Sequence, residues 1–142
     1  MAAMKPAVAA GADRLDAAFV AARQIPRLTE ADPDFDVACA YEVLAELHAR
    51  RIARGWQPVG RKIGFTNTTI WERYGVDRPM WSHVWDRTVT FAQGDHAELV
   101  LDGLMEPRIE PEIVFGIDGP LPPGDDPVDI LRAAAWIAPG FE

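Results

Sequence analysis

The sequence predicts an α+β protein in which helices come first and strands follow. Two observations carry this prediction. Apolar residues recur at helical spacing through the first third of the chain. After Gly55 the pattern changes to short β-rich stretches punctuated by glycine and proline. Helices followed by strands, rather than a regular alternation of the two, are typical of the α+β class.

We assign residues 1–57 to a helical lead-in. Its first helix is predicted at residues 12–24 and ends before Pro26. A second helix begins after Asp36, whose side chain can cap its N-terminus, and ends at Gly55. The apolar residues at helical spacing are Leu15, Phe19 and Val20 in the first helix and Val37, Ala40, Tyr41, Leu44, Leu47 and Ile52 in the second.

Residues 58–142 form the predicted β-rich part. The segment 58–65 is typical of a strand that ends in a turn, and Thr66 or Asn67 can cap a short helix that Gly75 ends. Few strands remain, and one begins just where the chain ends, so we expect an incomplete sheet. Further elements are predicted as strands at 87–92, 96–101 and 108–117 and as a helix at 127–136, with Pro127 at its first position.

Charge and composition limit the partners of this chain. Its 142 residues carry a net charge of -8, which argues against nucleic acid or an anionic membrane as the main partner. Cys39 is the only cysteine, so neither an internal disulfide nor a cysteine zinc cluster can form. Charged residues interrupt the N-terminal segment before a secretory signal develops, and no apolar run could cross a bilayer. We therefore expect a cytoplasmic protein.

Glu110 and Glu112 are the sharpest chemical feature of the sequence. Residues two apart on a strand share a face, so both carboxylates should point the same way. Both faces of segment 108–117 are largely apolar, which indicates burial on both sides. Adjacent buried carboxylates are unfavourable unless a divalent cation lies between them. The alternative is an edge strand with two solvated glutamates, which Pro111 favours.

Lys62 is the second candidate for chemistry. The chain has only one other lysine, Lys5. Lys62 stands between a predicted strand and a glycine turn, where its ammonium could enter a cleft as a point charge. A surface lysine at the end of a strand is the other interpretation.

Four segments together resemble the 2-keto-4-pentenoate hydratase family, which includes 4-oxalocrotonate decarboxylases and is related to the fumarylacetoacetate hydrolases. The similarity runs from about Leu15 to the last residue, in the family's order and near its spacings. It implies that the β-rich part holds the first strands of a mixed β-barrel or roll of the fumarylacetoacetate hydrolase type. The four segments are residues 62–67, 75–79, 107–113 and 138–142.

The resemblance also implies roles for single residues. Glu110, Glu112 and Glu142 match three metal ligands, and Lys62 matches an active-site lysine. Members of the family hold Mg²⁺ or Mn²⁺, which binds the carboxylate and 2-oxo oxygens of the substrate. With three glutamates, a dication and a 2-oxo carboxylate, two negative charges remain in excess, and Lys62 would halve that excess.

Two further residues, Arg61 and Thr66, are expected to contact the substrate. The activity implied by the resemblance is that of a divalent-metal-dependent lyase acting on small 2-oxo-alkenoate acids in the catabolism of aromatic compounds. The metal would serve as a Lewis acid that eases proton transfer at the carbon beside the oxo group.

One departure from the family pattern affects the choice of reaction. Hydratases of the family place an aspartate after the proline of the second segment, whereas here Met80 follows Pro79. Methionine cannot relay a proton, so activity like that of a 4-oxalocrotonate decarboxylase is an alternative. His83, Asp77 and Asp86 are nearby polar candidates for a substitute, although each is more typical of a loop residue.

Chain length leaves a third interpretation. Family members run on well past the third glutamate, so this chain is either a fragment or a naturally shortened relative. A shortened relative could act as a non-catalytic partner subunit. Because the family tends to form homo-oligomers, we expect self-association or pairing with a related enzyme subunit.

Overall fold

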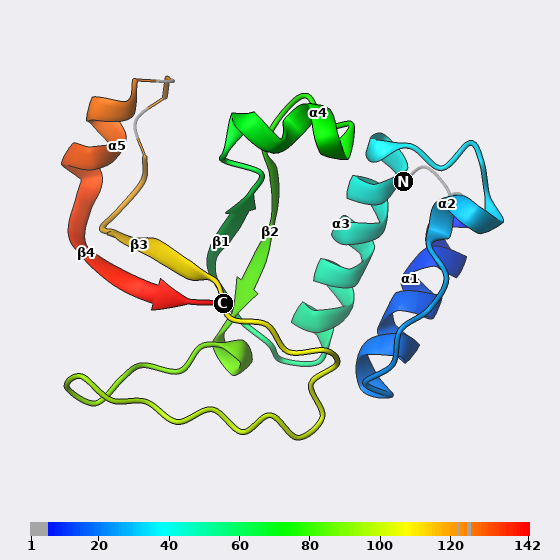
Figure 1. The fold of residues 1–142 in the computed structure, drawn as a ribbon, viewed down its shortest axis with the longest axis horizontal. Helices are drawn as coiled ribbons and strands as arrows, with labels where there is room; N and C mark the ends of the chain where they lie inside the picture. The colour runs from blue at the N-terminus through cyan, green and yellow to red at the C-terminus, as the bar shows by residue number, and fades with distance from the viewer. Residues whose placement is uncertain (1–5, 122, 125) are drawn as a thin grey trace. The chain divides into compact units, whose positions relative to one another are not determined.

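The computed structural model describes residues 6–121, 123–124 and 126–142 (Figure 1). The chain divides into two compact units, of which one reaches to Met105 and the other spans Glu106–Glu142. Helices and strands are mixed, as the α+β prediction requires, and the sheets among the described residues are two separate antiparallel pairs. No closed barrel is present among these residues. The fumarylacetoacetate hydrolase type of barrel and the domain boundary after residue 57 stay predictions.

Helix α1 (Pro6–Val20) packs against helix α3 (Val37–Ala53) through small residues. Gly11 lies so close to α3 that an added Cβ would come within 3.1 Å of the Cγ2 atom of Val43. Glycine therefore lets the two helices approach closely. A single turn, α2 (Leu28–Ala31), lies in the segment between them. The buried residues of this core are Val8, Ala12 and Val43, with Leu15, Phe35 and Leu47 packed against them.

The first helix differs from its predicted range of 12–24. It begins at Pro6 and ends at Val20. Phe19 and Val20 were expected on its apolar side, but their side chains are 55% and 78% exposed. The face that packs on α3 combines Val8 and the predicted Leu15 with small residues, and the small residues permit a closer approach of the helix axes.

The ends of α3 follow the predicted caps. The Asp36 carboxylate accepts a hydrogen bond of 2.8 Å from the backbone N–H of Cys39, and Gly55 adopts φ 79° just past the helix. Asp36 thereby satisfies one of the free N–H groups of the first turn. The left-handed conformation at Gly55 is one that glycine adopts without steric cost.

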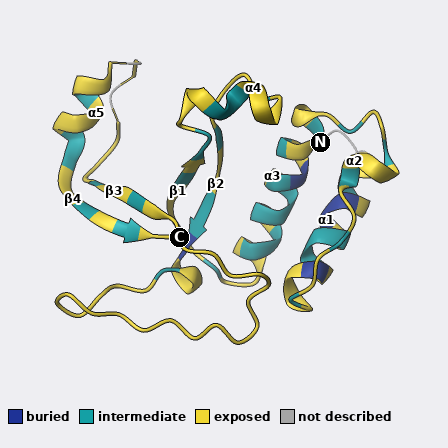
Figure 2. Ribbon diagram, viewed as in Figure 1, coloured by how far each residue is buried: buried dark blue, intermediate teal, exposed yellow. Residues whose placement is uncertain are grey.

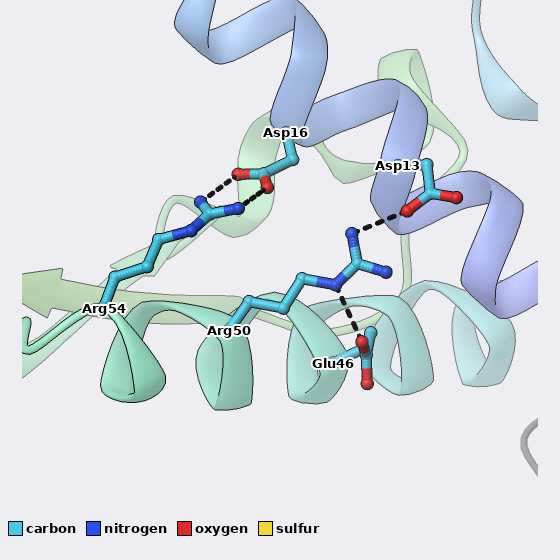
Figure 3. A network of polar contacts seen from close by, with 5 residues as sticks. All are labelled: Asp13, Asp16, Glu46, Arg50 and Arg54. Carbon is cyan, nitrogen blue, oxygen red and sulfur yellow. Dashed lines mark hydrogen bonds and ion pairs between the residues drawn. The ribbon is translucent and has the colours of Figure 1, made fainter.

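Ion pairs add to the contact between α1 and α3 (Figure 3). Arg50 of α3 donates to Asp13 of α1 over 2.7 Å and to Glu46 of its own helix over 2.7 Å. Arg54 forms a bidentate pair with Asp16. This hydrogen-bonded guanidinium holds the pKa of the Asp16 carboxyl below its ordinary value.

Strands β1 (Pro58–Gly64) and β2 (Met80–Trp85) form an antiparallel pair in the first unit. Strand β1 agrees with the predicted strand 58–65. Strand β2 was not predicted, although its aromatic residues alternate along the sequence. Between the strands lie a 3₁₀ turn (Thr68–Ile70), whose N-terminus Asn67 caps, and helix α4 (Trp71–Tyr74), after which Gly75 turns with φ 64°.

The strands predicted at 87–92 and 96–101 are wrong. Asp86–Thr88 is a 3₁₀ turn, and the segment 89–110 contains only an isolated bridge between Gln93 and His96. Its apolar side chains are mostly exposed, such as Phe91 at 74% and Val100 at 74%. A strand needs a neighbour for its backbone hydrogen bonds, and the described part of the chain offers the two predicted strands no ladder beyond the Gln93–His96 bridge.

The second unit pairs strand β3 (Pro111–Ile117) with strand β4 (Ala134–Phe141). Helix α5 (Pro127–Ala133) connects them, with Pro127 in its first turn as predicted. This helix ends at Ala133 rather than residue 136, because β4 already begins at Ala134.

Burial on both faces of the segment 108–117 was predicted and is not observed. Figure 2 shows both strands of this unit as largely exposed or intermediate. Ile113 is 69% exposed and Phe115 is 42% exposed. The apolar sequence pattern required a cover on each face, and none is present among the described residues.

Across the same described residues, no helix has both the length and the apolar character that a membrane span needs.

Candidate metal centre

Three glutamates converge at one end of the β3–β4 pair. One carboxylate oxygen from each of Glu110, Glu112 and Glu142 can be chosen so that all three oxygens lie within 4.8 Å of one another. The backbone sets this arrangement. Glu110 donates its N–H to the carbonyl of Glu142 over 2.7 Å, and Glu142 returns a bond of 2.9 Å. This reciprocal pair continues the ladder beyond Pro111 and Phe141, so Glu142 stands directly opposite Glu110.

Pro111 and Gly140 fit this local geometry. In an antiparallel ladder, hydrogen-bonded and non-hydrogen-bonded pairs alternate, so Pro111 follows in a non-bonded position where its missing N–H disrupts nothing on the β4 side. Gly140 stands opposite Glu112. An added Cβ there would come within 2.7 Å of the Cγ2 atom of Val114. The strand face beside the half-buried Glu112 is therefore kept clear of side chain.

The three carboxylates suit a hard divalent cation. Mg²⁺ binds oxygen ligands at about 2.0–2.1 Å, so ligands on opposite sides of the ion are roughly 4 Å apart. The 4.8 Å spread of the glutamate oxygens is compatible with this spacing after small side-chain rotations. Three negative charges gathered this closely repel one another unless a cation compensates them. The donor set and its spacing thus fit the predicted Mg²⁺ or Mn²⁺, and the role of the glutamates as ligands stays a prediction.

Lys62 lies in the first unit, on strand β1 and half-buried. Its partner across the ladder is Ser82 of β2. Met80 is two residues from Ser82 and therefore shares the face of Lys62. The methionine that departs from the family pattern thus occupies the lysine's side of the sheet.

None of the three polar residues considered as substitutes for the missing aspartate places a carboxylate on the strand face of Lys62. Asp77 and Asp86 lie outside strands β1 and β2. His83 belongs to strand β2 rather than to a loop, which corrects the sequence-based interpretation, and it points away from the Lys62 face. Asp77 is held by Arg78 through bonds of 2.7 and 2.9 Å. Asp86 accepts a 2.9 Å hydrogen bond from the N–H of Gln57.

Arg61 and Thr66 are placed differently from each other. Arg61 follows strand alternation onto the face opposite Lys62, and its guanidinium lies 4.6 Å from the centroid of the Trp81 ring. Arg61 and Lys62 therefore do not face one site on this strand. Thr66 is exposed in the turn after β1, next to Phe65 with φ 57°. Substrate contact by either residue stays a prediction.

Sequence reasoning missed an aromatic cluster on the face that carries Arg61. His48 of α3 has its ring centroid 4.0 Å from that of His83. Trp81 and Trp85 flank His83 on the same strand face. Alternation of these three aromatic residues at positions 81, 83 and 85 was the signal for strand β2.

Comparison with known proteins identifies relatives of this chain. It is 33% identical over 130 residues to a 2-hydroxyhexa-2,4-dienoate hydratase of Comamonas testosteroni and 34% identical over 131 residues to a 4-oxalocrotonate decarboxylase of a Pseudomonas species. The relatives that it resembles are named as 2-keto-4-pentenoate hydratases and 4-oxalocrotonate decarboxylases. No protein-family model matches it. These alignments cover 91% and 92% of the chain but 49% and 50% of the relatives, so the chain spans about half the length of these relatives.

Solved structures of the family agree with this relationship. The chain matches the 4-oxalocrotonate decarboxylase from Pseudomonas putida G7 with a TM-score of 0.86 and 29% sequence identity. The match covers 99% of this chain and 54% of the decarboxylase chain. That enzyme was solved in complex with calcium and acetate and also with magnesium and adipate. The resemblance drawn from sequence motifs is therefore confirmed.

Proposed function

We propose that this chain carries the metal-binding part of a divalent-metal-dependent lyase that acts on small 2-oxo-alkenoate acids in the catabolism of aromatic compounds. The observation that carries the proposal is the convergence of Glu110, Glu112 and Glu142 within 4.8 Å. Relatives named as hydratases and decarboxylases support the reaction class. The magnesium and calcium complexes of a related decarboxylase support a divalent ion.

The proposed chemistry gives separate roles to the three glutamates and to Lys62. The three glutamates would hold Mg²⁺ or Mn²⁺ and leave coordination positions for the carboxylate and 2-oxo oxygens of the substrate. When bound, the ion supplies Lewis acidity, which makes the carbon next to the oxo group easier to deprotonate. Lys62 would oppose the negative charge that develops on the substrate and hold or deliver a proton through its Nζ atom. Arg61 and Thr66 are kept as proposed substrate contacts.

Met80 favours a second candidate, activity like that of a 4-oxalocrotonate decarboxylase. Addition of water to a double bond calls for a group that activates the water molecule or protonates the substrate. On the described strand face of Lys62, the neighbouring residues are Met80 and Ser82 rather than a carboxylate. Loss of carbon dioxide does not require activation of a water molecule. A non-catalytic partner subunit is the remaining proposal. We also propose a cytoplasmic protein that self-associates or pairs with a related enzyme subunit.

Calorimetric titration of the chain with Mn²⁺ tests the proposal. We expect one specific site, whose affinity falls at least about 100-fold in Glu112→Gln, because a charged oxygen ligand is lost. Glu98→Gln is the matched control, since Glu98 is an exposed glutamate outside the cluster, and it should bind like the wild type. Absence of a specific site in the wild-type chain would contradict the proposal.

Turnover separates the candidate reactions. With Mg²⁺ or Mn²⁺ present, hydration of 2-hydroxypenta-2,4-dienoate removes its ultraviolet absorbance, whereas decarboxylation of an oxalocrotonate releases carbon dioxide. Specific metal binding without either reaction would favour the partner-subunit interpretation.

A further inference from the structure

A pocket of about 410 Å³ lies in the first unit between helix α3 and strand β2. Its helical residues occupy positions 41, 44, 45 and 48, which form one face of α3. Its strand residues, 81 and 83, lie on the face of β2 opposite Met80 and Ser82. The pocket therefore uses neither the glutamate cluster nor the Lys62 face. The lining residues are Tyr41, Leu44, Ala45, His48, Trp81 and His83.

Aromatic rings make up most of the walls of this pocket. The ring centroids of Tyr41 and Trp81 are 5.5 Å apart, and those of Trp81 and His83 are 5.2 Å apart. The hydroxyl of Tyr41 accepts a 3.2 Å hydrogen bond from the backbone N–H of Trp81, which joins the helix to the strand. Rigid aromatic faces favour a planar ligand, because it can stack without ordering flexible side chains.

The polar groups of the pocket are suited to a negative charge. None of its described lining residues is acidic, although the chain as a whole has a net charge of -8. The guanidinium of Arg61 lies over the Trp81 ring at 4.6 Å from its centroid. Arginine is permanently charged and binds carboxylates through two parallel hydrogen bonds. Arg61 does not itself line the pocket, but it places a cation against Trp81, which does.

The two histidines add hydrogen-bonding capacity inside the pocket. The Nδ1 atom of His48 is buried and has no hydrogen-bond partner among the residues that the structure describes. A buried polar atom of this kind is unfavourable unless a ligand or water satisfies it. Burial, together with the nearby His48, Arg61 and Arg51, lowers the pKa of His83, so this ring is neutral at neutral pH.

We propose that this pocket binds a small planar carboxylate, such as an aromatic or conjugated acid, as a site separate from the metal centre. The ring or conjugated chain stacks against Trp81 and Tyr41, and the carboxylate pairs with Arg61. The volume lies in the range of roughly 300–1,000 Å³ that is usual for small-molecule sites. No proposed metal ligand takes part in this site, but Arg61, which was proposed above as a substrate contact of the lyase, is assigned here to the separate pocket.

Titration of the full chain with trans-cinnamate, followed by tryptophan fluorescence and by amide NMR shifts, tests the proposal. Cinnamate should shift the amides of residues 41–48 and 81–83. The uncharged analogue trans-cinnamamide should bind at least about tenfold more weakly, because it lacks the charge that Arg61 recognises. Arg61→Gln should weaken cinnamate binding by a similar factor. Arg73→Gln is the matched control, since Arg73 stacks on Tyr74 outside the pocket, and it should leave binding unchanged.

Two further measurements keep the result unambiguous. Ala45→Trp should fill the pocket and abolish cinnamate binding while the far-ultraviolet circular dichroism stays like that of the wild type. Cinnamate binding should persist in Glu112→Gln and in the presence of EDTA, which separates this site from the metal centre. The proposal is overturned if cinnamate does not bind, if cinnamamide binds equally well, or if Glu112→Gln or EDTA abolishes binding.

Discussion

The two compact units differ in the interactions that stabilise each of them internally. In the first unit, side chains from separate segments meet, with Val43 only 2% exposed and with the Arg54–Asp16 pair joining α3 to α1. In the second unit the main interaction is the backbone hydrogen-bond ladder between β3 and β4. The side chains of Ile113 and Ile137 remain 69% and 57% exposed. The unit with the smaller core nevertheless carries the three converging glutamates.

This contrast shows that strand register can bring a group of carboxylates together. Glu142 meets Glu110 because the two backbones exchange hydrogen bonds. A slip of one residue along β4 would turn Glu142 to the other face of the pair. The glutamate cluster therefore depends on the interactions that maintain the register of β3 and β4.

The largest effect is expected from Gly116→Val in the second unit. Gly116 faces Trp136 across the ladder, and an added Cβ would overlap the indole ring. Such overpacking costs up to about 3 kcal/mol. Hydrogen exchange should accelerate for amides of residues 112–117 and not for those of α3. The double variant Gly116→Val with Trp136→Ala should recover most of the protection, and equal acceleration in both units would contradict the contrast drawn above.

A smaller destabilisation, this time of the first unit, is expected from Val43→Ala. This change leaves a cavity between α1 and α3 and should destabilise the first unit by about 2 kcal/mol. Chemical denaturation followed by circular dichroism at 222 nm measures the loss. Val37→Ala is the control, because Val37 lies on the same helix but is 50% exposed. Exchange at β3 should be unaffected by either change, and faster exchange there would show that the two units unfold together.

The smallest effect concerns pH and the α1–α3 ion pair. Arg54 lowers the pKa of Asp16 in the folded chain, so its contribution to stability is present above the unfolded pKa of the carboxyl. The contribution is lost as pH falls through the lower folded pKa. Asp16→Asn should therefore lower the Tm at pH 6 but hardly at pH 2.

Asp77→Asn is a matched control for that measurement. Asp77 pairs with Arg78, its neighbour in sequence, and both side chains are largely exposed. This pair joins no separate elements, so its removal should change Tm little at either pH. A pH-dependent loss as large as that of Asp16→Asn would count against a linking role for the Asp16 pair.

Features that a short stretch of chain completes by itself are predictable from this sequence. The Asp36 cap and the turns at Gly55 and Gly75 depend on neighbouring backbone only, and the structure confirms them. The predicted strands at 87–92 and 96–101 failed for the converse reason. Their residues have β propensity, but a strand exists only where another segment supplies hydrogen bonds.

By itself, the sequence determined that Glu110 and Glu112 share a face, because side-chain alternation along a strand follows from covalent geometry. Their spacing could not show that Glu142 would join them, and only the family resemblance pointed to it. Tertiary structure decided the pairing of β3 with β4, and it also decided that Arg61 and His83 face α3. These choices depend on contacts between segments far apart in the chain, where packing and backbone hydrogen bonding act together.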